Sequence, residues 1–363
     1  MRFMQLNALI FSAAAALALL LGLPLAGVWL SGRPVGLYLH FPPQTGYVQH
    51  APFNSLIFCC GLLLFLVVFS FIFSLLRPVL SRKRDFSPGR FPWWGAGGIF
   101  LMITSWILAW NRFPWFSPLQ PYTYFPLWLG YILSANGVTC WLSGICLATR
   151  KPIRFLLLFP LSSLFWWYFE WLNRFVQNWY YAGVEGFSAA GYVFHATLCF
   201  ATVLPAVQAT SELLAFLLEQ DRISGPRINF FSGKRVGWIL IVSMACVLLA
   251  LPLIPDLLFP FVWISPLLLL TGIQITSSKK TFFQPLARGN WGPILISALA
   301  ALTCGFFWEM WNWKSLAHWE YSIPFVDCCH IFEMPLLGYL GYLPFGIECE
   351  VIVDIKKIVR ITT

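Results

Sequence analysis

Three side chains near the end of the chain, and one nearer its middle, are of types that could carry acid/base chemistry. Glu309 and Glu333 supply carboxyl groups, and His330 precedes Glu333 by three residues, a spacing that puts two side chains on one face of a helix. Glu170 is a further carboxyl group in an apolar stretch. Because carboxyl and imidazole groups donate and accept protons in enzymes, we predict that Glu309, Glu333, His330 and Glu170 are catalytic.

Similar residues surround two of these acids. Glu170 and Glu309 are each followed three residues later by asparagine, and then by a tryptophan and a tyrosine two residues apart. Amide groups can orient a substrate, and aromatic faces attract a cationic group or intermediate. We therefore predict a substrate-binding set made of Asn173, Asn312, Trp311, Trp319, His318, Trp179 and Tyr181.

A metal site is the alternative use of the same imidazole and carboxyl groups. His330 and Glu333 have the order HxxE, whereas di-iron carboxylate proteins of the helix-bundle type use ExxH on two helices. The ten cysteines include no CxxC or Cys/His zinc spacing, and most of them lie in apolar runs. We predict no metal ligands, and the sequence leaves the cofactor unknown.

The composition determines which elements must position these residues. Of the 363 residues, 59% are hydrophobic and only 10% are charged, against about 25% charged in soluble domains, which excludes a water-soluble globule. A helix needs about 20 apolar residues to cross a bilayer. We predict an all-α integral membrane protein, a single polytopic domain over 1–363, with ten transmembrane helices at 8–30, 54–76, 92–110, 124–147, 155–173, 188–218, 236–254, 257–276, 291–312 and 333–353.

The basic residues predict the direction of these helices. With the N-terminus inside, 19 of the 23 lysines and arginines fall in inner segments, and the outer segments hold only Arg33, Arg112, Arg174 and Lys314. Basic residues accumulate in cytoplasmic loops, so the net charge of +9 reflects topology and does not indicate a nucleic-acid partner. We predict cytoplasmic termini in a bacterial plasma membrane. Glu309 then lies about 27 Å into its span, near the outer surface.

The resemblance between the two acidic segments also predicts an internal repeat. Candidate repeat units are 92–147, 155–218 and 291–353, each a helix, an outer loop and a returning helix. The alternative is that aromatic residues at membrane interfaces resemble one another through composition alone.

Three functions fit these patterns. The first is a membrane enzyme that acts on a lipid or isoprenoid through acid, histidine and aromatic side chains near the non-cytoplasmic face. The second is a transporter, because the tenth span contains Gly338, Gly341, Pro344 and Gly346 and is expected to break. The third is a non-catalytic subunit whose outer loops dock a membrane or periplasmic protein. Nucleotide-driven chemistry is disfavoured, since no Walker A or GxGxxG motif occurs.

Overall fold

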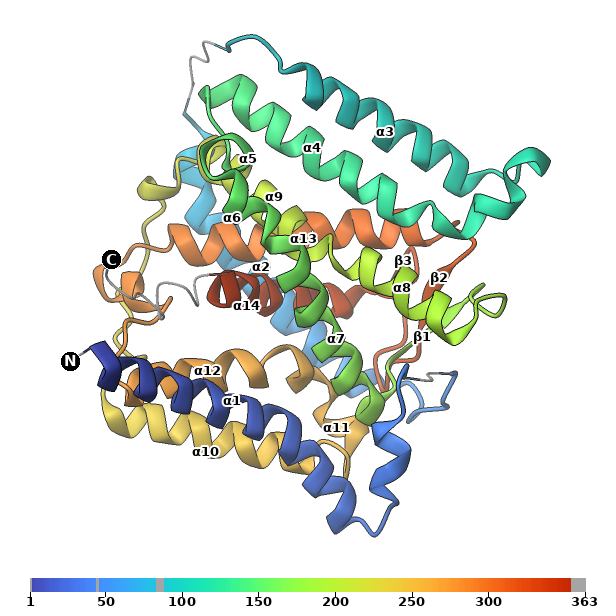
Figure 1. The fold of residues 1–363 in the computed structure, drawn as a ribbon. Coiled ribbons are helices and arrows are strands. Elements are labelled where there is room, and N and C mark those ends of the chain that lie inside the picture. Colours follow the sequence, from blue (N-terminus) through green and yellow to red (C-terminus); the bar gives the residue numbers. More distant parts are fainter. Residues whose placement is uncertain (1, 44–45, 83–87, 354–363) are drawn as a thin grey trace.

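The structure is a computed structural model that describes residues 2–43, 46–82 and 88–353 (Figure 1). Most of it is helical, and the longer helices run between two sides of the molecule. Strands β1 and β2 lie on one side, which we call the strand side; α1 begins and α14 ends on the opposite side, the terminal side. Several of the basic residues that carried the topology prediction, Lys83, Arg84, Lys356, Lys357 and Arg360, fall outside the described residues.

Apart from α2 (Ser55–Leu80), the long helices form three groups. One group contains α1 (Arg2–Leu30), α10 (Lys234–Ala250) and α12 (Ser265–Thr276), and a second contains α3 (Trp93–Trp110) and α4 (Tyr124–Ser143). Between them lie α7 (Leu158–Val176), α9 (Val203–Leu217), α13 (Gly292–Asn312) and α14 (Tyr342–Val353). Glycines let helices approach closely in membranes: a Cβ atom on Gly130 of α4 would lie 2.5 Å from the backbone nitrogen of Met102 in α3.

Shorter elements connect these helices. The α-helical ones are α5 (Leu147–Arg150), α6 (Pro152–Leu156), α8 (Ala189–Phe200) and α11 (Pro255–Leu258). The 3-10 turns are η1 (Val35–Leu39), η2 (Pro114–Tyr122), η3 (Gln220–Arg222), η4 (Phe259–Trp263), η5 (Gln284–Arg288) and η6 (Leu336–Gly341).

The prediction of ten transmembrane helices is wrong in number. Within the described residues, six helical segments are long and apolar enough to cross a membrane: α2 (Ser55–Leu80), α3, α6 with α7, α8 with α9, α13, and η6 with α14. A seventh is added if Pro255–Trp263 and Ser265–Thr276, which meet at an angle of 57°, form one broken span. The chain is therefore a candidate multi-pass membrane protein with six or seven spans.

The other predicted spans are helical but fall short in length or composition. Helix α1 has 29 residues, Arg2–Leu30, but its side chains are described only from residue 14 onward, so only the part Ala14–Leu30 is counted. Helix α10 has 17 residues. Helix α4 has 20 residues, but Ser134, Asn136 and Thr139 dilute its apolar character. These three side chains are buried and donate to backbone carbonyls one turn earlier, at 2.7–2.9 Å.

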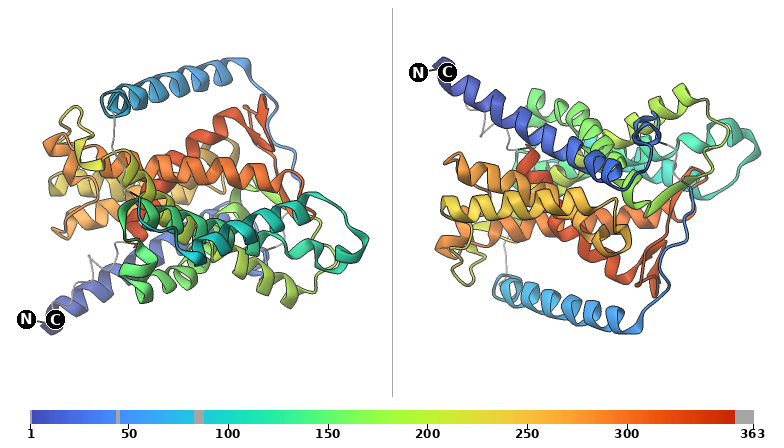
Figure 2. Two further views of the ribbon diagram at one scale, coloured as in Figure 1. Left: turned by 90° about the horizontal axis from the view of Figure 1, so that it is seen from above. Right: turned by 90° about the horizontal axis from the view of Figure 1, so that it is seen from below.

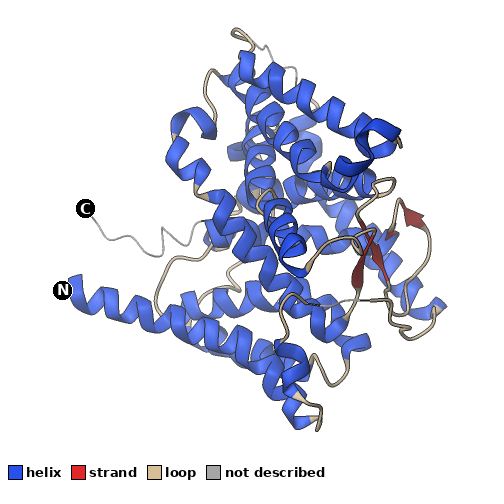
Figure 3. Ribbon diagram, turned by 45° about the vertical axis from the view of Figure 1, so that its right-hand side comes forward, coloured by secondary structure: helices blue, strands red, loops and turns tan. Residues whose placement is uncertain are grey.

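The expectation of an all-α fold also needs a small correction, because two short antiparallel sheets lie near the strand side (Figure 3). The first pairs β1 (Trp179–Ala182) with β2 (His318–Tyr321), and the second pairs β3 (His330–Ile331) with β4 (Met334–Pro335). Aromatic residues favour extended backbone, and the first sheet places each tryptophan opposite a tyrosine: Trp179 opposite Tyr321 and Trp319 opposite Tyr181.

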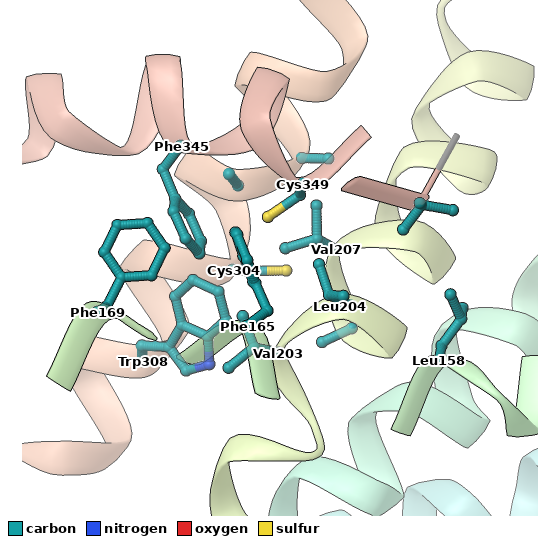
Figure 4. Packing of buried hydrophobic residues seen from close by; sticks show 14 of the residues in the cluster. Leu158, Phe165, Phe169, Val203, Leu204, Val207, Cys304, Trp308, Phe345 and Cys349 are labelled. Atoms are coloured by element: carbon teal, nitrogen blue, oxygen red, sulfur yellow. The ribbon is translucent and has the colours of Figure 1, made fainter. Parts of the chain in front are cut away.

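An aromatic core joins the central helices. Phe165 and Phe169 of α7 pack against Phe345 of α14, with ring centroids 5.8 and 5.5 Å apart, and Trp308 of α13 closes the cluster beside Cys304 (Figure 4). Aromatic pairs at such distances stabilise a core beyond the area they bury. This packing fixes α7 and α13 relative to each other, and these two helices carry Glu170 and Glu309.

Candidate functional site

Two asparagines near the ends of α7 and α13 fasten the first sheet to the helices. Asn312 binds the backbone of Trp319 twice: its Nδ2 donates to the carbonyl oxygen at 2.7 Å, and its Oδ1 accepts from the N–H at 2.8 Å. Asn173 binds the backbone of Trp179 in the same way, at 2.7 and 3.4 Å, and its Oδ1 also accepts from the N–H of Asn178. Both asparagines are buried, so they hold the strands at a fixed distance from the carboxyl groups one turn earlier.

Glu309 lies behind the second strand with no exposed surface. Its Oε1 accepts hydrogen bonds from the phenol of Tyr321 at 2.7 Å and from that of Tyr342, in α14, at 2.6 Å. The indole nitrogen of Trp319 donates to the Tyr321 oxygen at 2.8 Å. Glu309 therefore lies at the centre of a hydrogen-bonded group drawn from α13, β2 and α14.

Glu170 occupies the equivalent place behind the first strand. It is 1% exposed, and its Oε1 accepts from the indoles of Trp166 and Trp179, both at 3.1 Å, and from the phenol of Tyr181 at 2.6 Å. The two carboxyl groups differ in their charged neighbours. Arg174 acts electrostatically on Glu170, whereas Glu333 acts on Glu309.

The second oxygen of each carboxyl group, Oε2 of Glu170 and of Glu309, is buried and has no hydrogen-bond partner in the described part of the chain. A buried polar atom without a partner is uncommon and costs stability.

The phenols of the two strands remain protonated over the physiological range. Burial, followed by the charge of Glu309, raises the pKa of Tyr321 well above its usual value. Burial and the charge of Glu170 do the same to the pKa of Tyr181. Both side chains are therefore hydrogen-bond donors to their carboxyl groups.

A cavity of about 810 Å³ lies beside these groups. All five aromatic donors to the two carboxyl groups line it, and Trp319 does so as well; the set is Trp166, Trp179, Tyr181, Trp319, Tyr321 and Tyr342. The carboxyl groups themselves are not in the lining and lie one side chain behind it. The rest of the wall is mainly aliphatic and aromatic, which is typical of sites for apolar ligands.

The predicted substrate-binding residues divide into three sets. Trp179, Tyr181, Trp319 and His318 line the cavity. Asn173 and Asn312 position the strands. Trp311 lies elsewhere: it is buried against Trp128 and Phe307, with ring centroids 5.0 and 5.2 Å away.

The predicted histidines make other contacts. His330 is paired with Asp327 at 2.9 Å, and both side chains are largely exposed. His318 binds Glu320 at 3.2 Å. Glu333 is half-buried in the turn between β3 and β4. Among the hydrogen bonds of the described residues, none joins His318 or His330 to Glu309 or Glu170.

No group of three or more histidine, cysteine, aspartate or glutamate side chains within residues 2–43, 46–82 and 88–353 is arranged to hold a metal ion. The cofactor, if the protein uses one, is therefore not identified by a ligand set in this region.

Three further residues belong to the site, although the sequence prediction did not include them. Trp166 precedes Glu170 by four residues, so the spacing of one helical turn could have revealed it. Tyr342 is the first residue of α14, directly after η6, and the sequence carries no signal that it reaches Glu309. Trp263, in η4, stacks on Trp179 with ring centroids 5.8 Å apart and lines the cavity.

No protein-family model matches this sequence, and no curated protein and no solved structure shows significant similarity to it.

Proposed function

We propose that the protein is a membrane enzyme that transfers a proton to or from a lipid or isoprenoid held in the cavity, with Glu309 as the acid/base group. One observation carries the proposal: two buried carboxyl groups reach the same apolar cavity through aromatic donors that line it. A general acid or base must lie within hydrogen-bond reach of the proton it moves, directly or through a relay.

The donors distinguish the roles of the two carboxyl groups. A phenol both donates and accepts, so Tyr321 and Tyr342 can pass a proton between Glu309 and the cavity. Glu170 has one phenol donor, Tyr181, and two indole donors, Trp166 and Trp179. An indole nitrogen only donates, so two of the three donors of Glu170 can hold its charge but cannot relay a proton, whereas both donors of Glu309 can. We therefore assign the proton transfer to Glu309 and an electrostatic role to Glu170 behind aromatic faces, which attract positive charge.

Among the remaining predicted residues, Glu333 is assigned an electrostatic role beside Glu309, and His330 borders the site at the strand side. His318, Trp179, Tyr181 and Trp319 would contact the substrate. Asn173 and Asn312 would hold the strands that contact the substrate, and Trp311 would pack in the core behind them.

The location follows from the basic residues. Helix α2 ends, and α3 and α10 begin, on the terminal side, and basic residues flank these ends, among them Arg77, Arg90 and Lys234. Since such residues stay in the cytoplasm, the strand side would face away from it, in a bacterial plasma membrane.

Gene deletion followed by mass spectrometry of total lipid extracts tests the function. We expect one lipid or isoprenoid species to disappear or accumulate, and expect wild type to restore it while Glu309→Gln does not. Glu185→Gln is the matched control, because Glu185 is an exposed carboxyl group outside the cavity lining, and it should restore the species fully. Unchanged lipids after deletion would contradict the proposal.

A transporter is the second candidate, supported by one observation. The broken pair Pro255–Trp263 and Ser265–Thr276 bends by 57°, and both Asp256 and Trp263 line the cavity. Broken helices form substrate sites in transporters. Altered solute uptake with unchanged lipids would favour this function, and a stoichiometric protein partner after purification would instead favour a non-catalytic subunit.

A further inference from the structure

Helix α2 has one continuous face that changes surroundings halfway along. The face consists of Ile57, Gly61, Leu64, Val68, Ile72, Leu75 and Val79, which are spaced three or four residues apart. Its second half is covered by protein, because Ile72, Leu75 and Val79 pack with Ile223, Leu295 and Ile296. Its first half, from Ile57 to Val68, lines the cavity.

Helix α2 touches the rest of the protein near its start and along its second half. In both views of Figure 2 it stands apart from the other helices. At its start the N–H of Asn54 donates to the carbonyl of Phe325 at 2.9 Å. The helix approaches η6 at Gly61, where an added Cβ atom would lie 2.5 Å from Cδ1 of Leu337. The cavity therefore opens sideways, between a loosely attached helix and the helix bundle.

The cavity has a polar end and an apolar end. Asn178, His318 and Asp256 line it close to the first sheet and α11, on the strand side. Farther along α2 the wall is formed by Leu267, Phe283, Ile347 and Phe231, which belong to one hydrophobic cluster. A ligand that satisfies both ends has a polar group at the strand side and a hydrocarbon chain directed toward the terminal side.

We propose that this groove binds the hydrocarbon chain of a single-chain membrane amphiphile, which enters sideways from the bilayer between α2 and the bundle. Helix α2 forms one wall, and Leu336–Val353 and the bent pair Pro255–Trp263 and Ser265–Thr276 contribute to the other. Since all of these are candidate membrane spans, the opening would meet lipid chains rather than water. A volume of about 810 Å³ lies within the range of about 300–1,000 Å³ found for small-molecule sites. This inference rests on the proposed function only in taking the bound amphiphile as the substrate.

The proposal is tested with the full-length protein in lipid nanodiscs and a long-chain fatty acid that carries a diazirine in its chain. After illumination, peptide mass spectrometry should find the probe on Leu268 and Ile347, inside the groove, and on Leu63, which α2 presents away from it. Gly61→Trp or Leu64→Trp should fill the groove and reduce labelling of Leu268 and Ile347 at least about tenfold. Leu63→Trp is the control on the opposite face and should leave both labelled.

Two outcomes would overturn the proposal: no labelling inside the groove of the wild type, or equal labelling in folded Leu64→Trp and Leu63→Trp proteins. Glu309→Gln separates this inference from the proposed function. It should bind the probe as the wild type does while failing to restore the lipid species. Groove labelling without any lipid phenotype would support the amphiphile-binding groove and refute the enzyme. A lipid phenotype without groove labelling would support the enzyme and refute the groove.

Discussion

Replacing Gly305 with alanine is expected to separate Tyr342 from Glu309. A Cβ atom at position 305 would lie 2.5 Å from Cδ2 and Cε2 of the Tyr342 ring, whereas carbon atoms in contact prefer about 3.5–4.0 Å. The ring must therefore retreat by about 1 Å, which lengthens its hydrogen bond to Glu309 from 2.6 Å beyond the usual range.

The free energy of unfolding should fall by the sum of two costs, less one gain. Losing a hydrogen bond to a buried carboxyl group costs about 1–3 kcal/mol, and overpacking costs about 1–3 kcal/mol. The higher helix propensity of alanine returns about 1 kcal/mol, so the net loss is about 1–5 kcal/mol. Gly97→Ala is the matched control. Position 97 has open space around it, so only the propensity gain should remain there.

A double-mutant cycle of Gly305→Ala and Tyr342→Phe isolates the hydrogen bond. Phenylalanine keeps the ring and the steric conflict but removes the hydroxyl group, so both single variants lose the same bond. We expect a coupling energy of about 1–3 kcal/mol in reversible unfolding in mixed detergent micelles, followed by tryptophan fluorescence. Additivity within about 0.5 kcal/mol would refute the contact between Gly305, Tyr342 and Glu309.

Three further predictions concern the strands and the helix packing. Asn312→Ala removes both hydrogen bonds to the Trp319 backbone and should lower the free energy of unfolding by about 2–4 kcal/mol in the same unfolding assay. The hydrogen bond to Glu320, aided by burial, raises the pKa of Tyr180 to about 12. The folded protein therefore favours the neutral phenol, and the Tyr180–Glu320 hydrogen bond stabilises the fold fully below about pH 10. That stabilisation is lost as the pH rises toward 12. Glu320→Gln should shift that titration to lower pH in tyrosinate absorbance, and an unchanged curve would count against the pairing. Gly130→Leu should separate α3 from α4. Cysteines or spin labels introduced at facing positions of the two helices should then lose their disulfide or their short label distance. Retention of that contact would contradict the packing.

The sequence predicted the helices better than it predicted which of them cross a membrane. Every predicted span corresponds to a helical segment, because apolar runs near 20 residues have few other structures available in lipid. The number was wrong because apolar runs were counted without regard to where each helix begins, ends or bends. Helix α10 has 17 residues, α4 contains Ser134, Asn136 and Thr139, and the segment 255–276 is bent by 57°. Helix ends and bends of this kind are not encoded in the length of an apolar run.

The repeated pattern of glutamate, asparagine, tryptophan and tyrosine located much of the site, since its spacing brings each carboxyl group to its own strand. Asn173 and Asn312 make matching contacts to the strands, and that 92–147, 155–218 and 291–353 are repeat units stays a prediction. Contacts such as Tyr342 to Glu309, 33 residues apart in the chain, depend on how α13 packs against α14. Local spacing does not encode that packing.

The central claim is that Glu309 exchanges a proton with an apolar substrate in the cavity. The most direct measurement incubates the reconstituted protein with a total lipid extract in D₂O and follows the mass of each lipid. Wild type and Glu185→Gln should introduce carbon-bound deuterium into one species, and Glu309→Gln should not. Absence of deuterium with the wild type, or incorporation by Glu309→Gln at the wild-type rate, would contradict the claim.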